Sequence, residues 1–246
     1  MMKAMEHLFP ALTPRETFQG PVLVTVPHPD DEVIGCGAMM AWHASRGHRV
    51  VVVHATDGAG GDPDGKFGDI ASLRKAESAR ALEILGVREW RELGFRDGRL
   101  EEAQGLEGIL EDLLRRLQPR TFYTLSPLDN HKDHRVLARA AAAAAFRALP
   151  PGTECLVMGI NNMGLPNTLV DITDLLETKE RALRAFESQL AYLDFATKVV
   201  WRDKAATVNI EDPGVKACEA FMRLPASRLP EFLEKAEALE GVLYPA

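Results

Sequence analysis

The chain has 246 residues, enough to bury the core of one domain but short for two. Its formal charge is −7 and its pI is near 5.6, with no block of basic residues, which argues against a nucleic acid or an anionic membrane as partner. We therefore expect a single domain over residues 1–246 that acts on a small, neutral or weakly charged molecule.

Cysteine use and hydropathy indicate the compartment. Cys36, Cys155 and Cys218 are far apart and odd in number, which favours free thiols in a reducing cytoplasm over a disulfide framework. The segment Met1 to Pro14 has no long apolar core, and no window approaches the ~20 apolar residues that cross a bilayer. The sequence therefore predicts a soluble, cytoplasmic protein.

The first predicted strand leads directly into a polar cluster. Residues 22–26 are aliphatic or β-branched throughout rather than alternating between apolar and charged, which is typical of a buried parallel strand. A helix is predicted from about Val33 to Arg46, closed by Gly47. Residues 28–32, His-Pro-Asp-Asp-Glu, therefore lie on a strand-to-helix turn, where open α/β sheets bind their ligands.

The spacing within this cluster favours a metal site. Pro29 biases His28 towards an extended backbone and begins the helix, so His28 and Asp31 can converge. A histidine nitrogen and a carboxylate oxygen, with Asp30 left over as a base, suit a catalytic zinc. The alternative is helix capping, in which Asp30 accepts first-turn amides while Asp31 and Glu32 face the positive helix end. A histidine buried beside carboxylates without a partner is costly, which favours the metal site.

A glycine-rich loop follows the second predicted strand, residues 50–55, which completes a right-handed parallel unit. The stretch from Gly58 to Gly68 looks like a phosphate-binding loop, but Phe67 stands where Ser or Thr should coordinate magnesium. Acidic residues within it, such as Asp62, would also repel phosphate. We therefore predict a mobile loop at the edge of the sheet, which would act as a lid.

The next helix and turn carry two further polar candidates. Over residues 71–85 a helix presents Arg74 and Glu77 on one face, a spacing typical of an ordinary surface ion pair. Asp97 lies in an Asp-Gly sequence that is typical of a turn. The residues alone therefore assign no chemistry to Arg74 or Asp97.

The second half of the chain continues the alternation. Helices are predicted over 106–117, 135–149, 177–193, 215–223 and 229–239, and strands over 121–125, 154–160, 169–172 and 198–201. A further polar segment, His131-Lys132-Asp133-His134, follows the strand predicted at 121–125. His131 and His134 share a face if a helix begins here, so spacing leaves open which of them binds metal. Strands and helices in this order predict a Rossmann-like, three-layer α/β domain with a mostly parallel sheet.

Two motifs together carry a family resemblance. The string Pro27-His28-Pro29-Asp30-Asp31-Glu32 resembles the signature of the PIG-L/LmbE family of metal-dependent N-deacetylases, and His131-Lys132-Asp133-His134 is similar to its second motif, His-x-Asp-His. The resemblance implies one zinc ion per chain, or another divalent metal, at the C-terminal ends of the strands. It assigns the ligands as His28, Asp31 and His134.

The resemblance also implies catalytic roles. Three protein ligands leave a position open for water and substrate, as a catalytic zinc requires. We expect Asp30 to take the proton of that water and a protonated His131 to stabilise the oxyanion of the tetrahedral intermediate. Asp133 would orient His131 through a hydrogen bond. Family members have Arg-x-x-Glu at the position of Arg74, with the arginine reaching the substrate pocket, and Asp97 is a second candidate for substrate binding.

The predicted function is removal of an acetyl group from an N-acetylglucosamine conjugate, for example a low-molecular-weight thiol precursor. Chito-oligosaccharides or another N-acyl amine are alternative substrates. A non-enzymatic nucleotide-binding module would explain the glycine-rich loop but not the two His/Asp motifs, and a metallo-phosphoesterase would want more ligands for two metal ions. By resemblance, we also expect a homo-oligomer, a trimer or hexamer.

Overall fold

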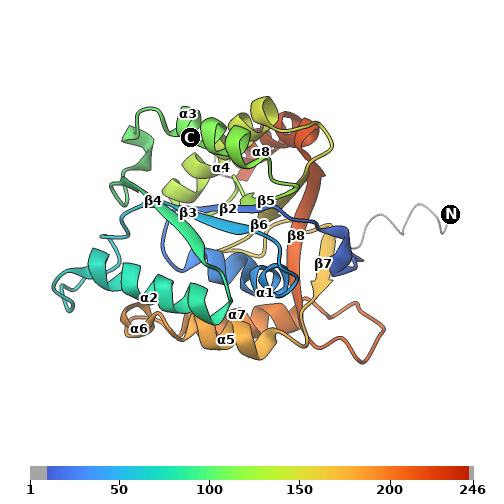
Figure 1. Ribbon diagram of the computed structural model, residues 1–246, viewed down its shortest axis with the longest axis horizontal. Coiled ribbons are helices and arrows are strands. Elements are labelled where there is room, and N and C mark those ends of the chain that lie inside the picture. Colours follow the sequence, from blue (N-terminus) through green and yellow to red (C-terminus); the bar gives the residue numbers. More distant parts are fainter. Residues whose placement is uncertain (1–9, 244–246) are drawn as a thin grey trace.

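A sheet runs through the middle of the molecule with helices on both faces (Figure 1). The computed structural model describes residues 10–243, so the prediction for Met1–Pro14 falls mostly outside the described part. The strands are β1 Ala11–Leu12, β2 Val22–Val26, β3 Val50–Thr56, β4 Glu89–Phe95, β5 Thr121–Leu125, β6 Glu154–Met158, β7 Thr168–Asp171 and β8 Cys218–Pro225. Their order across the sheet is β1-β7-β8-β6-β5-β2-β3-β4, and β8 alone among them runs antiparallel to its neighbours. The predicted mostly parallel sheet is confirmed.

The helices form the two outer layers (Figure 1). One layer contains α1 Asp31–Ser45, α2 Ile70–Ile84, α5 Leu176–Leu183, α6 Glu187–Leu190 and α7 Phe195–Ala205. The other contains α3 Leu106–Leu117, α4 Lys132–Ala148 and α8 Leu229–Leu243. Short 3₁₀ turns are η2 Arg15–Thr17, η3 Leu100–Glu102 and η4 Ala226–Arg228. Within residues 10–243, none of these helices combines the length and the apolar character needed to cross a bilayer.

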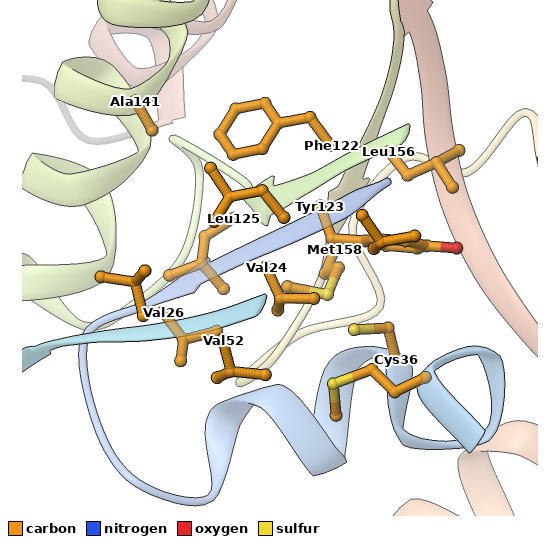
Figure 2. Packing of buried hydrophobic residues seen from close by; sticks show 14 of the residues in the cluster. Val24, Val26, Cys36, Val52, Phe122, Tyr123, Leu125, Ala141, Leu156 and Met158 are labelled. Atoms are coloured by element: carbon orange, nitrogen blue, oxygen red, sulfur yellow. The ribbon is translucent and has the colours of Figure 1, made fainter. Parts of the chain in front are cut away.

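The central strands are buried at every position, because a parallel sheet is covered on both faces. Figure 2 shows Phe122 on the side of the sheet that faces Ala141 of α4. Val24 and Val52 point to the opposite side, towards Cys36 of α1. Two helical layers therefore pack against one continuous apolar core.

The order of the strands places a crevice between β2 and β5. After β2 the chain passes through α1 to β3 and through α2 to β4 at the sheet edge, and then returns through α3 to β5 on the other side of β2. The loops that follow β2 and β5 lead into α1 and α4, which lie in different layers (Figure 1). At such a switch point the loops diverge and leave room for a ligand. The two sequence motifs occupy these two loops.

Three predicted elements were wrong in the last third of the chain. Residues 198–201, predicted as a strand, belong to helix α7, whose buried residues Ala196, Val199, Val200 and Asp203 recur at helical spacing. Residues 215–223, predicted as a helix, lie mostly in β8, because pairing with both β6 and β7 overrides the helix propensity of Ala and Glu. The helix predicted over 177–193 is interrupted between α5 and α6.

Strand β4 was missed, and its composition explains why. It alternates only weakly, carries Glu89, Arg91 and Glu92, and forms the edge of the sheet beyond β3. Charged side chains are common on edge strands, because they discourage pairing with other molecules. Such a strand resembles a loop when only its hydropathy is considered.

Candidate metal centre and catalytic site

The two motifs meet at the crevice between β2 and β5. His28 follows β2, Asp31 is the first residue of α1, and His134 lies in the first turn of α4. The backbone N–H of His28 donates to Asp31 Oδ2 over 3.0 Å, which fixes the turn between strand and helix. All three side chains are buried and line a cleft of about 310 Å³.

Three candidate donor atoms form a nearly equilateral triangle. Asp31 Oδ2 lies 3.2 Å from His28 Nδ1 and 3.4 Å from His134 Nε2, and the two nitrogens are 3.3 Å apart. Donor atoms at about 2.0 to 2.2 Å from a tetrahedral zinc ion stand roughly 3.3 to 3.5 Å from one another. The two imidazole nitrogens and one carboxylate oxygen therefore fit one face of a tetrahedral metal site.

The second nitrogen of each imidazole faces a carboxylate. His28 Nε2 lies 3.0 Å from Asp97 Oδ1 and 3.4 Å from Asp133 Oδ2. His134 Nδ1 lies 3.2 Å from Asp129 Oδ1. A proton on the outer nitrogen leaves the lone pair of the inner nitrogen directed at the triangle, as metal-binding histidines require. The same contacts place Asp97, a predicted substrate residue, against a predicted ligand.

The carboxylates around His28 and His134 favour positive charge at the site. Burial alone would lower the pKa of His134, but the charges of Asp31 and Asp129 and their hydrogen bonds raise it to about 9. Burial likewise opposes the charged form of His28, yet hydrogen bonds to Asp133, Asp31 and Asp97 raise its pKa well above the ordinary value. Either protons or a bound cation must balance this cluster of acids.

His131 lies beside the triangle, and its ring bonds to the protein backbone rather than to a carboxylate. It is the N-cap of α4, and its Nδ1 accepts a hydrogen bond from the backbone N–H of Asp133 over 3.2 Å. His131 could also contribute to a ligand group with His28 and His134, whose donor atoms lie within 4.8 Å of one another. Because its Nδ1 is already an acceptor, a neutral His131 carries its proton on Nε2.

One detail of the predicted roles of His131 and Asp133 was wrong, and the other stays a prediction. Burial and the charges of His28 and His134 lower the pKa of His131, which opposes the protonated form that we expected. The carboxylate of Asp133, which we expected to orient His131, accepts instead from the backbone N–H groups of Gly98 and Leu100, at 2.7 and 3.1 Å. Asp133 orients His131 only through its own backbone N–H.

Asp30 presents a carboxylate that is not part of the triangle. Its backbone has φ of 124°, a left-handed value that is costly for a residue with a side chain. The carboxylate lines the cleft, and Arg74 donates to its Oδ2 over 3.0 Å. Burial raises the pKa of Asp30 to about 7, although the charge of Arg74 opposes this rise. The capping alternative fails for Asp30, because its side chain caps no amide of α1.

Arg74 is buried rather than paired on the surface. Its guanidinium also donates to the carbonyl oxygens of Pro29 and Gly58, at 2.7 and 3.0 Å. Glu77 is buried as well, and accepts from the backbone N–H and the hydroxyl of Ser188. The surface ion pair considered for these two residues was wrong, because both are buried and each has other partners.

The glycine-rich loop forms one wall of the cleft through Gly60 and Gly61. Asp62 accepts from the backbone N–H groups of Lys66 and Phe67, both at 2.8 Å. Backbone amides that would have to bind phosphate are therefore already used, which argues against a nucleotide-binding loop. Motion of this loop as a lid stays a prediction.

Asp129 was missed by the sequence analysis. It is buried, contacts the ring of His134, and accepts from the backbone N–H of His131 over 2.9 Å. Its signal in the sequence was an acidic residue two positions before the second motif and four positions after the end of a buried strand. Such a residue is also common in turns, so its contact with His134 required the three-dimensional arrangement.

Comparisons with known proteins identify the family of the chain. The model of the family described as "PIG-L: GlcNAc-PI de-N-acetylase" matches residues 23–145. The chain is 32% identical over 185 residues to the diacetylchitobiose deacetylase of Thermococcus kodakarensis, a match that covers 68% of this chain and 69% of that protein. It is 30% identical over 182 residues to the probable N-acetyl-alpha-D-glucosaminyl L-malate deacetylase 2 of Bacillus subtilis, covering 68% and 82%.

A solved structure shows the same fold. The N,N'-diacetylchitobiose deacetylase from Pyrococcus horikoshii, complexed with its inhibitor MPG, aligns with a TM-score of 0.73 and 27% identity over 84% of each chain. The family match spans both motifs and every residue of the donor triangle. The chain therefore belongs to the PIG-L family.

Proposed function

We propose that this chain is a metal-dependent N-deacetylase that removes the acetyl group from an N-acetylglucosamine-containing conjugate. One observation carries the proposal: the donor triangle of His28, Asp31 and His134 opens into a cleft beside the carboxylate of Asp30. The relatives named above are deacetylases of N-acetylated sugars, which supports the same reaction class.

We assign zinc as the metal. Two imidazole nitrogens and one carboxylate oxygen form a donor set typical of hydrolytic zinc sites, although iron(II) or cobalt would also accept it. When bound, such an ion supplies a Lewis acid that polarises an amide carbonyl and makes water a nucleophile at neutral pH.

The side chains of the cleft supply the proton transfers. Asp30, held by Arg74 and free of the triangle, is placed to take the proton of the attacking water. His131, with its proton on Nε2, is placed to donate a hydrogen bond to the oxyanion of the tetrahedral intermediate. The protonated Asp30 can then return the proton to the leaving amine, which restores the starting state. In this scheme Asp133 and Asp97 hold His28, and Arg74 holds Asp30.

The substrate is proposed to be a small N-acetylated sugar conjugate, of which a thiol precursor is one example. Arg74 and Asp97 stay predicted substrate contacts, since both line the cleft. The homo-oligomer, trimer or hexamer, and the cytoplasmic location also stay predictions.

The test combines metal analysis with acetate release. Purified protein should contain about one equivalent of divalent metal per chain and release acetate from at least one member of a panel: diacetylchitobiose, the N-acetylglucosaminides of inositol and malate, and methyl N-acetylglucosaminide. Protein without bound metal, or metal-loaded protein inactive on every member, would contradict the proposal.

His131→Ala and His134→Ala are matched variants that separate the two histidines, because the same change is made three residues apart. His134→Ala should lose the metal. His131→Ala should keep the metal and lose turnover by about 10²–10⁴-fold, the usual effect of removing a group that acts on the transition state. The opposite pattern of metal loss would show that the ligand assignment is wrong.

A further inference from the structure

The cleft has an apolar wall beside the candidate catalytic groups. Ile34 of α1, Ile160 after β6, and Tyr192, Leu193 and Phe195 around the start of α7 all line it. The side chain of Leu193 is about half exposed, with a relative exposure of 51%, so this wall extends to the rim of the cleft. Apolar and aromatic side chains at a rim suit the faces of a sugar ring or another uncharged group.

Two of the uncharged polar side chains in the cleft are amides with free oxygens. Asn161 donates through Nδ2 to Asp129 over 2.8 Å, and Gln189 donates through Nε2 to the carbonyl of Gly61 over 3.1 Å. Among the contacts of the described residues, the side-chain oxygens of Asn161 and Gln189 accept no hydrogen bond. These oxygens are available to accept from hydroxyl groups, but they would repel a carboxylate.

The described residues offer no uncommitted cation to this wall. Arg74 lines the cleft, but its guanidinium donates to Gly58 and Pro29 and its charge is paired with Asp30, although its buried Nε–H has no partner. Arg202 lies behind the wall, where it donates to the carbonyl oxygens of Ile34 and Gly159 at 2.7 and 3.0 Å.

Lys66 is the remaining cation to consider. Its ammonium lies over the ring of Tyr192, 4.0 Å from the centroid, and 3.1 Å from the carboxylate of Asp64. Lys66 is not among the residues that line the cleft, and Asp64 offsets its charge. The carboxylates of Asp30 and Asp97, by contrast, do line it.

We infer that the substrate of this chain carries a neutral aglycone, the group attached to the anomeric carbon of N-acetylglucosamine, such as a second sugar or a polyol. This inference rests on the proposed function and goes beyond it by excluding an acidic aglycone such as malate. An anionic aglycone would be desolvated beside acidic side chains and free amide oxygens without a cation to pair with. A sugar or polyol instead meets an apolar wall and acceptors for its hydroxyl groups.

The test compares kcat/KM of the metal-loaded enzyme for two neutral conjugates, diacetylchitobiose and the inositol N-acetylglucosaminide, with kcat/KM for the malate conjugate. We expect the better neutral conjugate to exceed malate by about tenfold or more, since a like-charge contact costs at least that factor. The difference should shrink as salt is raised, because the repulsion is screened. Equal or faster reaction of the malate conjugate would overturn the inference and leave the proposed function intact. Inactivity on all three would instead count against the proposed function.

A matched pair of variants at the rim tests the electrostatic cause. Leu193→Arg places a cation on the wall, and should raise kcat/KM for the malate conjugate relative to diacetylchitobiose by several-fold. Leu193→Gln adds a polar side chain without charge and should leave that ratio within about twofold of wild type, with metal content unchanged in both variants. If both variants shift the ratio equally, or neither shifts it, the lack of a cation is not what selects the aglycone.

Discussion

Asp129 connects both histidines of the second motif to the wall of the cleft. It lies 3.2 Å from His134 Nδ1 and accepts from the backbone N–H of His131 and from Asn161 Nδ2. A carboxylate at the outer nitrogen of a ligating imidazole fixes the orientation of the ring and raises its basicity. Asp129 is therefore a positioning residue for His134.

Asp129→Asn should weaken metal binding by about 10- to 100-fold, the usual effect of losing such a partner. Competition with a chelator measures this affinity, and the circular dichroism spectrum should remain that of the wild type. Asp112→Asn is the matched control, because the carboxylate of Asp112 is exposed on α3 and pairs only with Arg116 among the described residues. Unchanged metal affinity in Asp129→Asn would remove Asp129 from the support of His134.

The candidate ligands could be proposed from the sequence more readily than the residues that contact them. His28, Asp31 and His134 belong to motifs whose spacing, with the family resemblance, points to a metal site. The contacts of Asp97, Asp129 and Asp133 depend on which loops meet at the switch point, and single-sequence spacing holds no such information. The same limit explains the error over the carboxylate of Asp133, whose closest partners lie in the turn after β4.

Strand β6 is followed by a tight loop that supports the site. A Cβ atom at Gly159 would meet the backbone oxygen of Asn162 at 2.4 Å and the backbone nitrogen of Gly164 at 3.0 Å. Backbone atoms cannot rotate away as a side chain can, so the whole loop would have to move. Asn161, which holds Asp129, lies within this loop.

Gly159→Ala should lower the free energy of unfolding by about 1–3 kcal/mol, the typical cost of forcing extra volume into a packed region. Gly152→Ala is the matched control at the other end of β6, because a Cβ there meets nothing within 4 Å and its φ is not positive. The control should be neutral or more stable by about 0.4–1 kcal/mol, since alanine restricts the unfolded chain. Denaturant unfolding measures both, and similar stability of the two variants would contradict the close approach at Gly159.

Elements buried on both faces were the most predictable ones. The strands β2 and β3 consist mostly of aliphatic and β-branched residues, and β5 combines Thr with aromatic residues and Leu. The positions of all three in the sequence match the predictions closely. The errors lie in β8 and α7, where local propensity opposed the tertiary structure. β8 contains a buried acid, Glu219, and α7 contains consecutive β-branched residues, so each resembles the other class when it is considered alone.

A buried charge network joins four elements behind the site. Lys179 of α5 lies 2.6 Å from Asp203 of α7 and 2.8 Å from Glu219 of β8, and all three side chains are almost fully buried. The backbone at Cys36 is non-helical, which frees the backbone N–H groups of Ala38 and Met39 in α1. These donate to the Glu219 carboxylate over 2.9 and 3.0 Å. The network thereby holds α1, which begins with Asp31, against the sheet.

Lys179→Met should destabilise the protein by about 3–5 kcal/mol, because it leaves the buried carboxylate of Glu219 without a cation and leaves Asp203 with Arg202, 3.4 Å away, as its remaining cation. Lys75→Met is the control, since Lys75 pairs with Glu92 at the surface and should cost less than about 1 kcal/mol. Thermal or denaturant unfolding measures both. If Lys179→Met lost no more stability than Lys75→Met, the proposed importance of the network would be contradicted.

The loss of stability in Lys179→Met should also depend on pH. Burial already raises the pKa of Glu219, and Asp203 adds to this rise while Lys179 opposes it. Without Lys179 the pKa of Glu219 in the folded state rises further. At intermediate pH the native protein therefore binds a proton on Glu219 that the unfolded chain releases. The cost is then fully present above that raised pKa and decreases as the pH falls, so the variant should differ less from wild type at pH 5 than at pH 8.

The cleft is divided among loops that belong to different strands. The donor triangle comes from the loops after β2 and β5, whereas the apolar wall comes mainly from the segments after β6 and around α6 and α7. We expect mutations in these latter segments to alter which conjugate is accepted without disturbing the donor triangle. Related enzymes can therefore differ in the substrate that they accept while keeping a single chemistry, and laboratory evolution of new substrates should begin at residues 160–161 and 189–195.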